Sequence, residues 1–364
     1  MILAIVPFLK LPAFYESFLY LVFHWIVLAT SWNILSGYSG YFSFGHGAFF
    51  GAGIYTTAVL ATRFDWPFLW TLPAAALIAA LLGVGLGAVV FRVRHVRGEL
   101  FALLTLAATF VLATIVLNTP IDGGPGVYLS AVAVPKLAPT ASGAFYMMAL
   151  VLAILTMAIA YRIVRARLGL GLFAIHDDED AAEVMGVPTF RYKLVALGIS
   201  CALAGAAGGI HALFVSYVTA NGVFNITVPL TVILMSVLGG TGYWAGPAIG
   251  ATVITSLLYA TTAAEQAIAG KAAIGAVLVA AVLFMPNGVL GWALERRRSR
   301  RLDAAKRPGA AGAMRSAAEA PPSRHSAGET LLAVRGLRKS FKGIRALDGV
   351  DLHVREGEIL GVLG

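Results

Sequence analysis

His46 is the first residue in this sequence whose type and position suggest a chemical role. It lies between Gly45 and Gly47 in an apolar segment, and the surrounding stretch from Trp32 to Gly51 is dense in glycine. An ionisable side chain inside an apolar segment is a functional candidate, because placing it there is energetically costly. A structural role competes, and we favour it: the imidazole would satisfy backbone groups that are freed where glycine breaks the helix.

Four other polar residues are weaker candidates for lining a transport path, since interrupted helices often line such paths. They are Asn33, Thr105, Asn118 and Asp122. The sequence shows no metal-ligand cluster, no catalytic triad and no carboxylate pair inside an apolar segment. An intramembrane enzyme would need a catalytic group near His46, and an ion-gradient-driven transporter would need such carboxylates. Both classes are therefore disfavoured.

A short acidic segment runs from Asp177 to Gly186, between two apolar segments. We expect a short helix here, because acidic residues in its first turn interact favourably with the helix dipole and Gly186 suits a left-handed cap at its end. The motif consists of Asp180, Ala181, Ala182 and Gly186. A solvated acidic loop is the alternative. In a partner-binding role, the small alanines would let the helix fit into a groove.

The C-terminal residues have the alternation that is typical of short strands. Apolar residues recur at Leu347, Val350, Leu352 and Val354, before a turn at Gly357. An earlier strand is predicted at 331–335, and Phe341 follows it beside two lysines. These residues belong to a soluble domain rather than to a membrane.

The elements that must position the polar residues are apolar helices, because about 20 apolar residues cross the hydrocarbon core of a membrane. We predict nine, of which the seventh is short enough to be a half-helix that protein or a water-filled cavity must cover. The apolar stretch Met1–Leu9 is too short to span a membrane by itself and would be part of a tenth helix. The nine are Phe14–Leu35, His46–Ala61, Phe68–Phe91, Leu100–Leu117, Ala144–Val164, Leu194–Val215, Val228–Leu238, Ala245–Thr262 and Ala272–Leu290.

Lysine and arginine predict the orientation, because loops on the cytoplasmic side carry an excess of both. With nine alternating segments, three basic groups fall on one side, which we predict to be cytoplasmic. They are Arg92, Arg94 and Arg97; Arg162, Arg165, Arg167, Arg191 and Lys193; and the run Arg296–Arg301.

Composition separates an apolar body from a polar tail. The chain of 364 residues is 59% hydrophobic and only 12% charged, whereas a soluble domain has about 25% charged residues. Residues 1–294 carry a net charge of +2 and residues 295–364 a net charge of +7. The basic run directly follows an apolar segment, so we interpret it as a cytoplasmic flank and not as a nucleic-acid site. We predict a transmembrane domain at 1–294, a disordered basic linker at 295–330 and the start of a soluble domain at 331–364.

The tail resembles the opening of an ABC-transporter ATP-binding domain. The resemblance lies in Ala346–Leu352 and in Gly357–Gly364, which in that family leads straight into the phosphate-binding loop. It implies that Gly364 is the first glycine of that loop and that Phe341 stacks on adenine. The alternative is that Phe341 is only an aromatic residue of the domain core. The Lys and Ser/Thr that hold the ATP phosphates and Mg²⁺ would lie beyond residue 364. The segment alone would not hydrolyse ATP.

The apolar body resembles the permeases of branched-chain amino acid ABC importers. Trp32–Gly51 carries the strongest match, supported by Arg97–Leu106, Leu238–Gly242 and Pro286–Gly288. The acidic motif at 180–186 resembles the coupling helix of ABC importer permeases, with Asp180 in place of their glutamate.

The two resemblances together imply a polytopic all-α permease of nine or ten helices, followed by a linker and the first strands of an α/β ATPase domain. They imply a bacterial inner-membrane location, a second permease subunit, an ATP-binding subunit or domain and an extracytoplasmic substrate-binding protein. The substrate would be a branched-chain or related amino acid, with an amide or urea as the alternative.

Overall fold

The computed structural model describes residues 3, 6–8, 12–93, 98–122, 124–263, 288–294, 296, 330–341, 344–358 and 360–361. The chain divides into two compact units, residues 1–298 and 299–364, and each has its own architecture. Most of the ninth predicted helix, the predicted linker and Gly364 lie outside the described residues.

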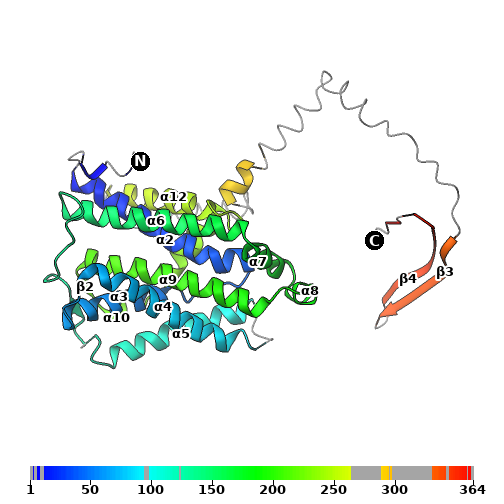
Figure 1. Ribbon diagram of the computed structural model, residues 1–364, viewed down its shortest axis with the longest axis horizontal. Coiled ribbons are helices and arrows are strands. Elements are labelled where there is room, and N and C mark those ends of the chain that lie inside the picture. Colours follow the sequence, from blue (N-terminus) through cyan, green and yellow to red (C-terminus); the bar gives the residue numbers. More distant parts are fainter. Residues whose placement is uncertain are drawn as a thin grey trace, which may run out of the picture. The chain divides into compact units, whose positions relative to one another are not determined.

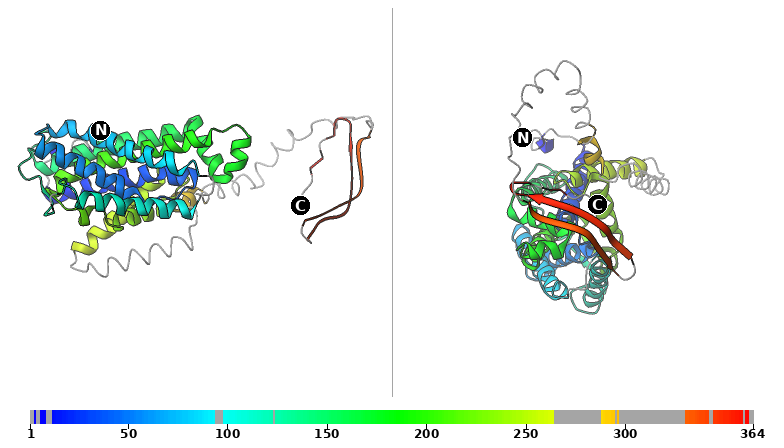
Figure 2. Two further views of the ribbon diagram at one scale, coloured as in Figure 1. Left: turned by 90° about the horizontal axis from the view of Figure 1, so that it is seen from below. Right: turned by 90° about the vertical axis from the view of Figure 1, so that its right-hand side faces the viewer.

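The first unit is a bundle of roughly parallel and antiparallel helices (Figure 1, Figure 2). A short 3-10 turn at Val6–Phe8 precedes them, and two-residue strands β1 and β2 pair antiparallel at Val127–Tyr128 and Tyr217–Val218. The helices are α2 (Ala13–Ser39), α3 (His46–Arg63), α4 (Phe68–Val90), α5 (Glu99–Leu117), α6 (Ala141–Arg165), α7 (Arg167–Asp177), α8 (Glu179–Val184), α9 (Thr189–Val215), α10 (Ala220–Val223), α11 (Thr227–Gly239) and α12 (Gly246–Ala263).

Six helical stretches among the described residues are long and apolar enough to cross a membrane: α2, α4, α5, α6, α9 and the pair α10–α11. Helices α3 and α12 coincide with the second and eighth predicted segments. The seventh segment is confirmed as a short helix, since α11 has 13 residues. The first predicted segment was too short, because α2 continues through Gly37 to Ser39.

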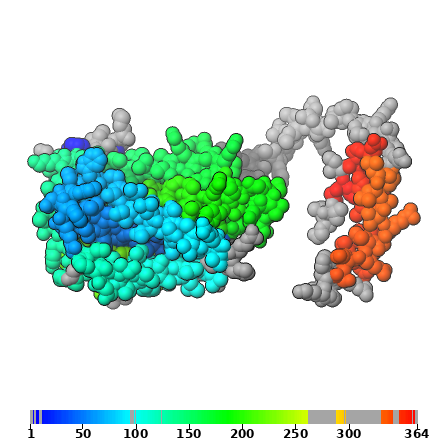
Figure 3. All heavy atoms as spheres, turned by 60° about the horizontal axis from the view of Figure 1, so that its bottom comes forward, coloured from blue at the N-terminus to red at the C-terminus, as the bar shows by residue number. Residues whose placement is uncertain are grey.

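Helix α2 lies at the centre of the bundle, whereas α4 and α5 lie at its surface. Trp32, Ile34 and Tyr38 of α2 are fully buried. In contrast, large apolar side chains on α4 and α5 are exposed, as Leu81 and Leu103 are. In Figure 3, atoms coloured blue to cyan cover much of the face in view, beside green ones. An apolar exposed face suits contact with lipid rather than with water.

Glycine brings α3 and α9 into direct backbone contact. A Cβ atom on Gly53 would lie 2.1 Å from the carbonyl oxygen of Gly205, and one on Gly208 would lie 2.2 Å from that of Phe50. No other residue fits at these positions without separating the helices. Small residues take this role in membrane bundles, where no hydrophobic effect between helices drives their association.

The second unit contains a β-hairpin. Strand β3 (Thr330–Phe341) pairs antiparallel with β4 (Ile344–Arg355), and Phe341 is opposite Ile344 at the hairpin end. Arg338 and Asp348 form an exposed ion pair across the strands at 3.3 Å. The two strands predicted from the alternating pattern are therefore confirmed, and the first is longer than predicted.

Candidate translocation and coupling sites

The glycine-rich segment breaks the helix only between residues 40 and 45. Gly40 caps α2 with a left-handed φ of 73°, and α3 starts at His46. Side chains from neighbouring helices hold the break: Trp32 Nε1 donates to the Ser43 carbonyl at 2.7 Å, and the Phe44 amide donates to Thr105 Oγ1 at 3.0 Å. Side chains of α2 and α5 therefore satisfy these two of the freed backbone groups.

His46 is buried at the start of α3, and its partner is a side chain. Its Nε2 lies 2.8 Å from Ser31 Oγ on α2, and the Ser31 hydroxyl also donates to the carbonyl of Leu28. Trp32 and Thr105 bond to freed backbone groups at the break, whereas the bond of His46 is to the Ser31 hydroxyl. His46 instead ties α3 to α2 across the break.

The other predicted path residues do not form one site. Thr105 joins His46 at the break, and Asn33 is buried on α2, where its Oδ1 would lie 1.9 Å from a Cβ on Gly37. Asp122 belongs to the opposite end of the bundle, where it accepts a hydrogen bond of 2.5 Å from Tyr55 of α3. Asn118 is exposed there and donates to its own helix at Thr114.

The acidic motif forms α8, which lies with α7 at one end of the bundle, opposite β2 and α10 (Figure 1). Asp178 caps α8, its Oδ1 accepting from the Ala181 amide at 2.9 Å. At the other end, the Gly186 amide donates to the Glu183 carbonyl and the Val187 amide donates to the Ala182 carbonyl, each at 3.0 Å. With Gly186 at φ 87°, these bonds form a Schellman cap.

The exposed side of α8 differs from the predicted one. Asp180 and Ala181 are exposed, but Ala182 is only 5% exposed and packs into its own bundle. The tip of the segment is apolar and open, since Val184 and Met185 are 87% and 84% exposed. A partner at this end would therefore meet Ala181, Val184 and Met185 rather than Ala182.

Three residues without a role predicted from sequence are in contact where α8, α9 and the helix break come together. Glu179 begins α8, Lys193 is the fifth residue of α9, and Tyr41 lies in the break. Lys193 Nζ is 2.5 Å from Glu179 Oε1 and 3.1 Å from Tyr41 Oη, and the Tyr41 hydroxyl donates to Glu179 Oε2 at 2.5 Å. Tyr41 and Glu179 are 138 residues apart in sequence, so no local pattern reveals the contact.

A second buried polar group, also missed from sequence, lies between α2 and α9. The His24 and His211 rings stack with centroids 4.6 Å apart, and Tyr20 Oη lies 3.1 Å from His211 Nδ1. His211 borders a cavity of about 180 Å³ near β2. The sequence could have revealed both histidines as candidates, because each is an ionisable residue within a predicted apolar segment.

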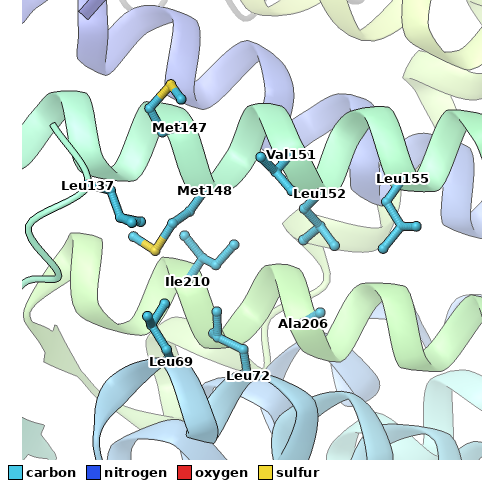
Figure 4. Close-up of a pocket in the computed structure, with 10 residues that line it drawn as sticks. All are labelled: Leu69, Leu72, Leu137, Met147, Met148, Val151, Leu152, Leu155, Ala206 and Ile210. Atoms are coloured by element: carbon cyan, nitrogen blue, oxygen red, sulfur yellow. The ribbon is translucent and has the colours of Figure 1, made fainter. Parts of the chain in front are cut away.

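A different cavity, of about 360 Å³, lies between α4, α6 and α9. Figure 4 shows its lining, which includes Leu72, Met148, Leu152 and Ile210. All the lining side chains are apolar, so this cavity has nothing to bind the charged groups of a polar solute.

A bundle of membrane-length helices with apolar exposed faces is the architecture of a polytopic membrane protein. Residues 14–285 match the family described as branched-chain amino acid transport system / permease component, and the chain belongs to that family.

Curated relatives match both parts of the chain. The high-affinity branched-chain amino acid transport system permease protein LivM of Escherichia coli (strain K12) is 32% identical over 244 residues, which is 60% of this chain and 56% of that protein. LivM of Salmonella typhimurium is 31% identical over 245 residues, with the same shares. The chain thus spans little more than half the length of these relatives.

A further match is to an ATPase. The xylose import ATP-binding protein XylG of Burkholderia cenocepacia is 56% identical over 36 residues, which is 10% of this chain and 7% of that protein. No solved structure matches this chain.

Proposed function

We propose that this chain is the membrane-spanning subunit of an ATP-driven importer that moves branched-chain or related amino acids into the cytoplasm. Family membership carries the proposal, and the name of the LivM relatives, a high-affinity branched-chain amino acid transport system, gives the substrate class. The similarity of a short segment to import ATP-binding proteins supports ATP as the energy source.

The α8 end of the bundle is the side proposed to meet the ATPase. The exposed Val184 and Met185 give it an apolar tip, and Ala181 leaves room beside them. Arg92, Arg165 and Arg167 belong to the same end, which supports a cytoplasmic orientation through the positive-inside bias. We assign Asp180, Ala181 and Gly186 to the coupling segment, and Ala182 to its packing against the bundle.

The tail is proposed to open the ATP-binding domain. Phe341, at the end of β3, would stack on adenine, and Gly364 would begin the loop that receives the phosphates and Mg²⁺. The whole importer would also require a second permease subunit and an extracytoplasmic binding protein that delivers the substrate. The domain boundaries predicted at 294 and 330 are part of the same proposal.

Uptake of radiolabelled leucine into proteoliposomes tests the proposal. The complete transporter should accumulate leucine only with binding protein outside and ATP with Mg²⁺ inside, and unlabelled isoleucine and valine should compete. Unlabelled urea and acetamide are tested as competitors in the same assay, because an amide or urea is the alternative substrate. Uptake that follows an imposed ion gradient without ATP would contradict the proposal.

A further inference from the structure

The contact of Tyr41, Glu179 and Lys193, named here the 41–179–193 cluster, places an ion pair almost out of reach of water. The side chains of Lys193 and Glu179 are only 4% and 11% exposed. Removing two charges from water is costly unless the geometry and the additional hydrogen bonds are good. Both conditions hold, because the Tyr41 hydroxyl bonds to both partners and the Lys193 ammonium also lies over the rings of Tyr41 and Phe91, at 4.5 and 5.0 Å.

The cluster joins α8 and the beginning of α9 to the helix break. Tyr41 directly follows Gly40, and a Cβ on Gly40 would lie 2.9 Å from Nδ1 of His176 in α7. The Tyr41 ring also packs edge-on against Phe91 and Phe101, at 5.6 and 5.3 Å. The break is therefore in contact with the α7–α8 segment on one side and with the ends of α4 and α5 on the other.

The other end of the break is tied to polar groups inside the bundle. Five residues after Tyr41, His46 bonds to Ser31 of α2, and between them Phe44 bonds to Thr105 of α5. A rigid shift of Tyr41 would therefore act on these bonds through only a few residues of non-helical backbone. Charge-assisted hydrogen bonds suit this role, because they are short and directional and do not slide as apolar contacts do.

We propose that the 41–179–193 cluster transmits movement of the α7–α8 segment to the glycine-rich break and so to the groups around His46. In this role Tyr41, Glu179 and Lys193 are positioning residues for transport. The inference rests on the proposed function, because it takes α8 as the segment that the ATPase moves.

The sharpest variant is Tyr41→Phe, which removes the hydroxyl and keeps the ring on Phe91 and Phe101. Its matched control is Tyr146→Phe, because Tyr146 is also buried and its hydroxyl donates to the Leu3 carbonyl at 2.6 Å. We expect Tyr41→Phe to lower leucine transported per ATP hydrolysed by at least about fivefold, the lower end of typical coupling free energies. Tyr146→Phe should leave this ratio unchanged.

A purely structural role makes a different prediction for the same pair of variants. It would lower the melting temperature, and it would lower transport and ATP hydrolysis together, so that their ratio is unchanged. Equal ratios in Tyr41→Phe, Tyr146→Phe and wild type would therefore overturn the proposal. Melting of each detergent-solubilised variant is measured on the same preparation to show that the protein is folded.

The double variant Tyr41→Phe/Glu179→Gln tests whether the residues act as a unit. Glu179→Gln alone should lower the transport ratio, and the double variant should lower it no further than the larger single effect, since residues in one network are not additive. Multiplicative losses would contradict a shared cluster. A wild-type transporter that takes up leucine without ATP would refute the proposed function itself, whereas ATP-driven wild-type uptake with a normal Tyr41→Phe ratio would refute only the cluster's role.

Discussion

Three pairs of polar side chains in the helical unit are bonded across different elements. His46 bonds to Ser31, Asp122 to Tyr55 and Glu179 to Lys193. Each bond links two different elements, with Asp122 in the turn after α5, so residue type identified a candidate but not its partner. The sequence thus indicated His46 and Asp122 as unusual, whereas the reason for each is a contact that only the packed helices create.

Tyr55→Phe tests the bond at the end of the bundle opposite α8. The change leaves the buried Asp122 carboxyl without the Tyr55 hydroxyl that now donates to it at 2.5 Å. An unsatisfied buried acceptor costs about 1–3 kcal/mol. We expect lower thermal stability of the detergent-solubilised protein. Tyr128→Phe is the matched control, because Tyr128 is 65% exposed, and equal melting temperatures for the two variants would argue against a stabilising bond.

Phe341→Ala tests the adenine-stacking role in the chain that includes the complete ATP-binding domain. Stacking of a base on an aromatic ring contributes roughly 1–3 kcal/mol. ATP affinity should therefore fall by about 5- to 150-fold, at about 1.4 kcal/mol per decade, while Phe341→Trp should retain it. If alanine leaves affinity unchanged and instead lowers the melting temperature of the nucleotide-free domain, Phe341 is a core residue.

At the scale of elements, the long apolar helices were predictable, whereas only one of the two short helices α7 and α8 was predicted. Apolar length alone located α4, α5 and α6, because it reflects the thickness of the membrane. Helix α7 was missed, since its 11 residues are too few to span and its glycines disfavour a helix. Helix α8 was predicted from its acidic first turn and its glycine, but its inward face depends on tertiary packing.

Gly186→Val tests the cap of α8. Nothing lies within 4 Å of a Cβ built on Gly186, so the substitution meets no steric clash and acts only through the left-handed φ of 87°. That conformation costs a non-glycine residue roughly 1–2 kcal/mol, a factor of about 5 to 30 against the capped helix. ATP-driven leucine uptake should fall accordingly while the protein remains inserted.

Gly186→Asn is the control for this prediction, because asparagine tolerates the left-handed region. It should retain most of the uptake. Equal uptake in the valine and asparagine variants would mean that the cap does not matter for coupling.

At the scale of the whole molecule, the bundle has two chemically different ends. The α8 end carries Arg92, Arg165 and Arg167, and Arg165 lies 4.4 Å over the ring of Tyr161. At the opposite end, Trp66 and Trp70 are 47% and 69% exposed, as expected for aromatic side chains at a membrane interface. The distribution of lysine and arginine in the sequence predicted that the two ends differ. Lys193 was one of the residues in that count, but it is buried in an ion pair and is not exposed to solvent.

The proposed orientation is tested at the two ends of a single helix. Lys136 precedes α6 and Arg165 ends it, and both side chains are exposed. Helix α6 has 25 residues, or about 37 Å at 1.5 Å per residue, which exceeds the hydrocarbon core of about 30 Å. The two positions must then lie on opposite sides of the membrane.

In a Cys201→Ala background, a membrane-impermeant thiol reagent added to spheroplasts should label Lys136→Cys and leave Arg165→Cys unlabelled. Inside-out vesicles should reverse the pattern. The native Cys201 is fully buried, so it is replaced only to exclude background labelling at that position. Labelling of position 165 from outside would place α8 away from any cytoplasmic ATPase, and both the orientation and the coupling role of α8 would have to be abandoned.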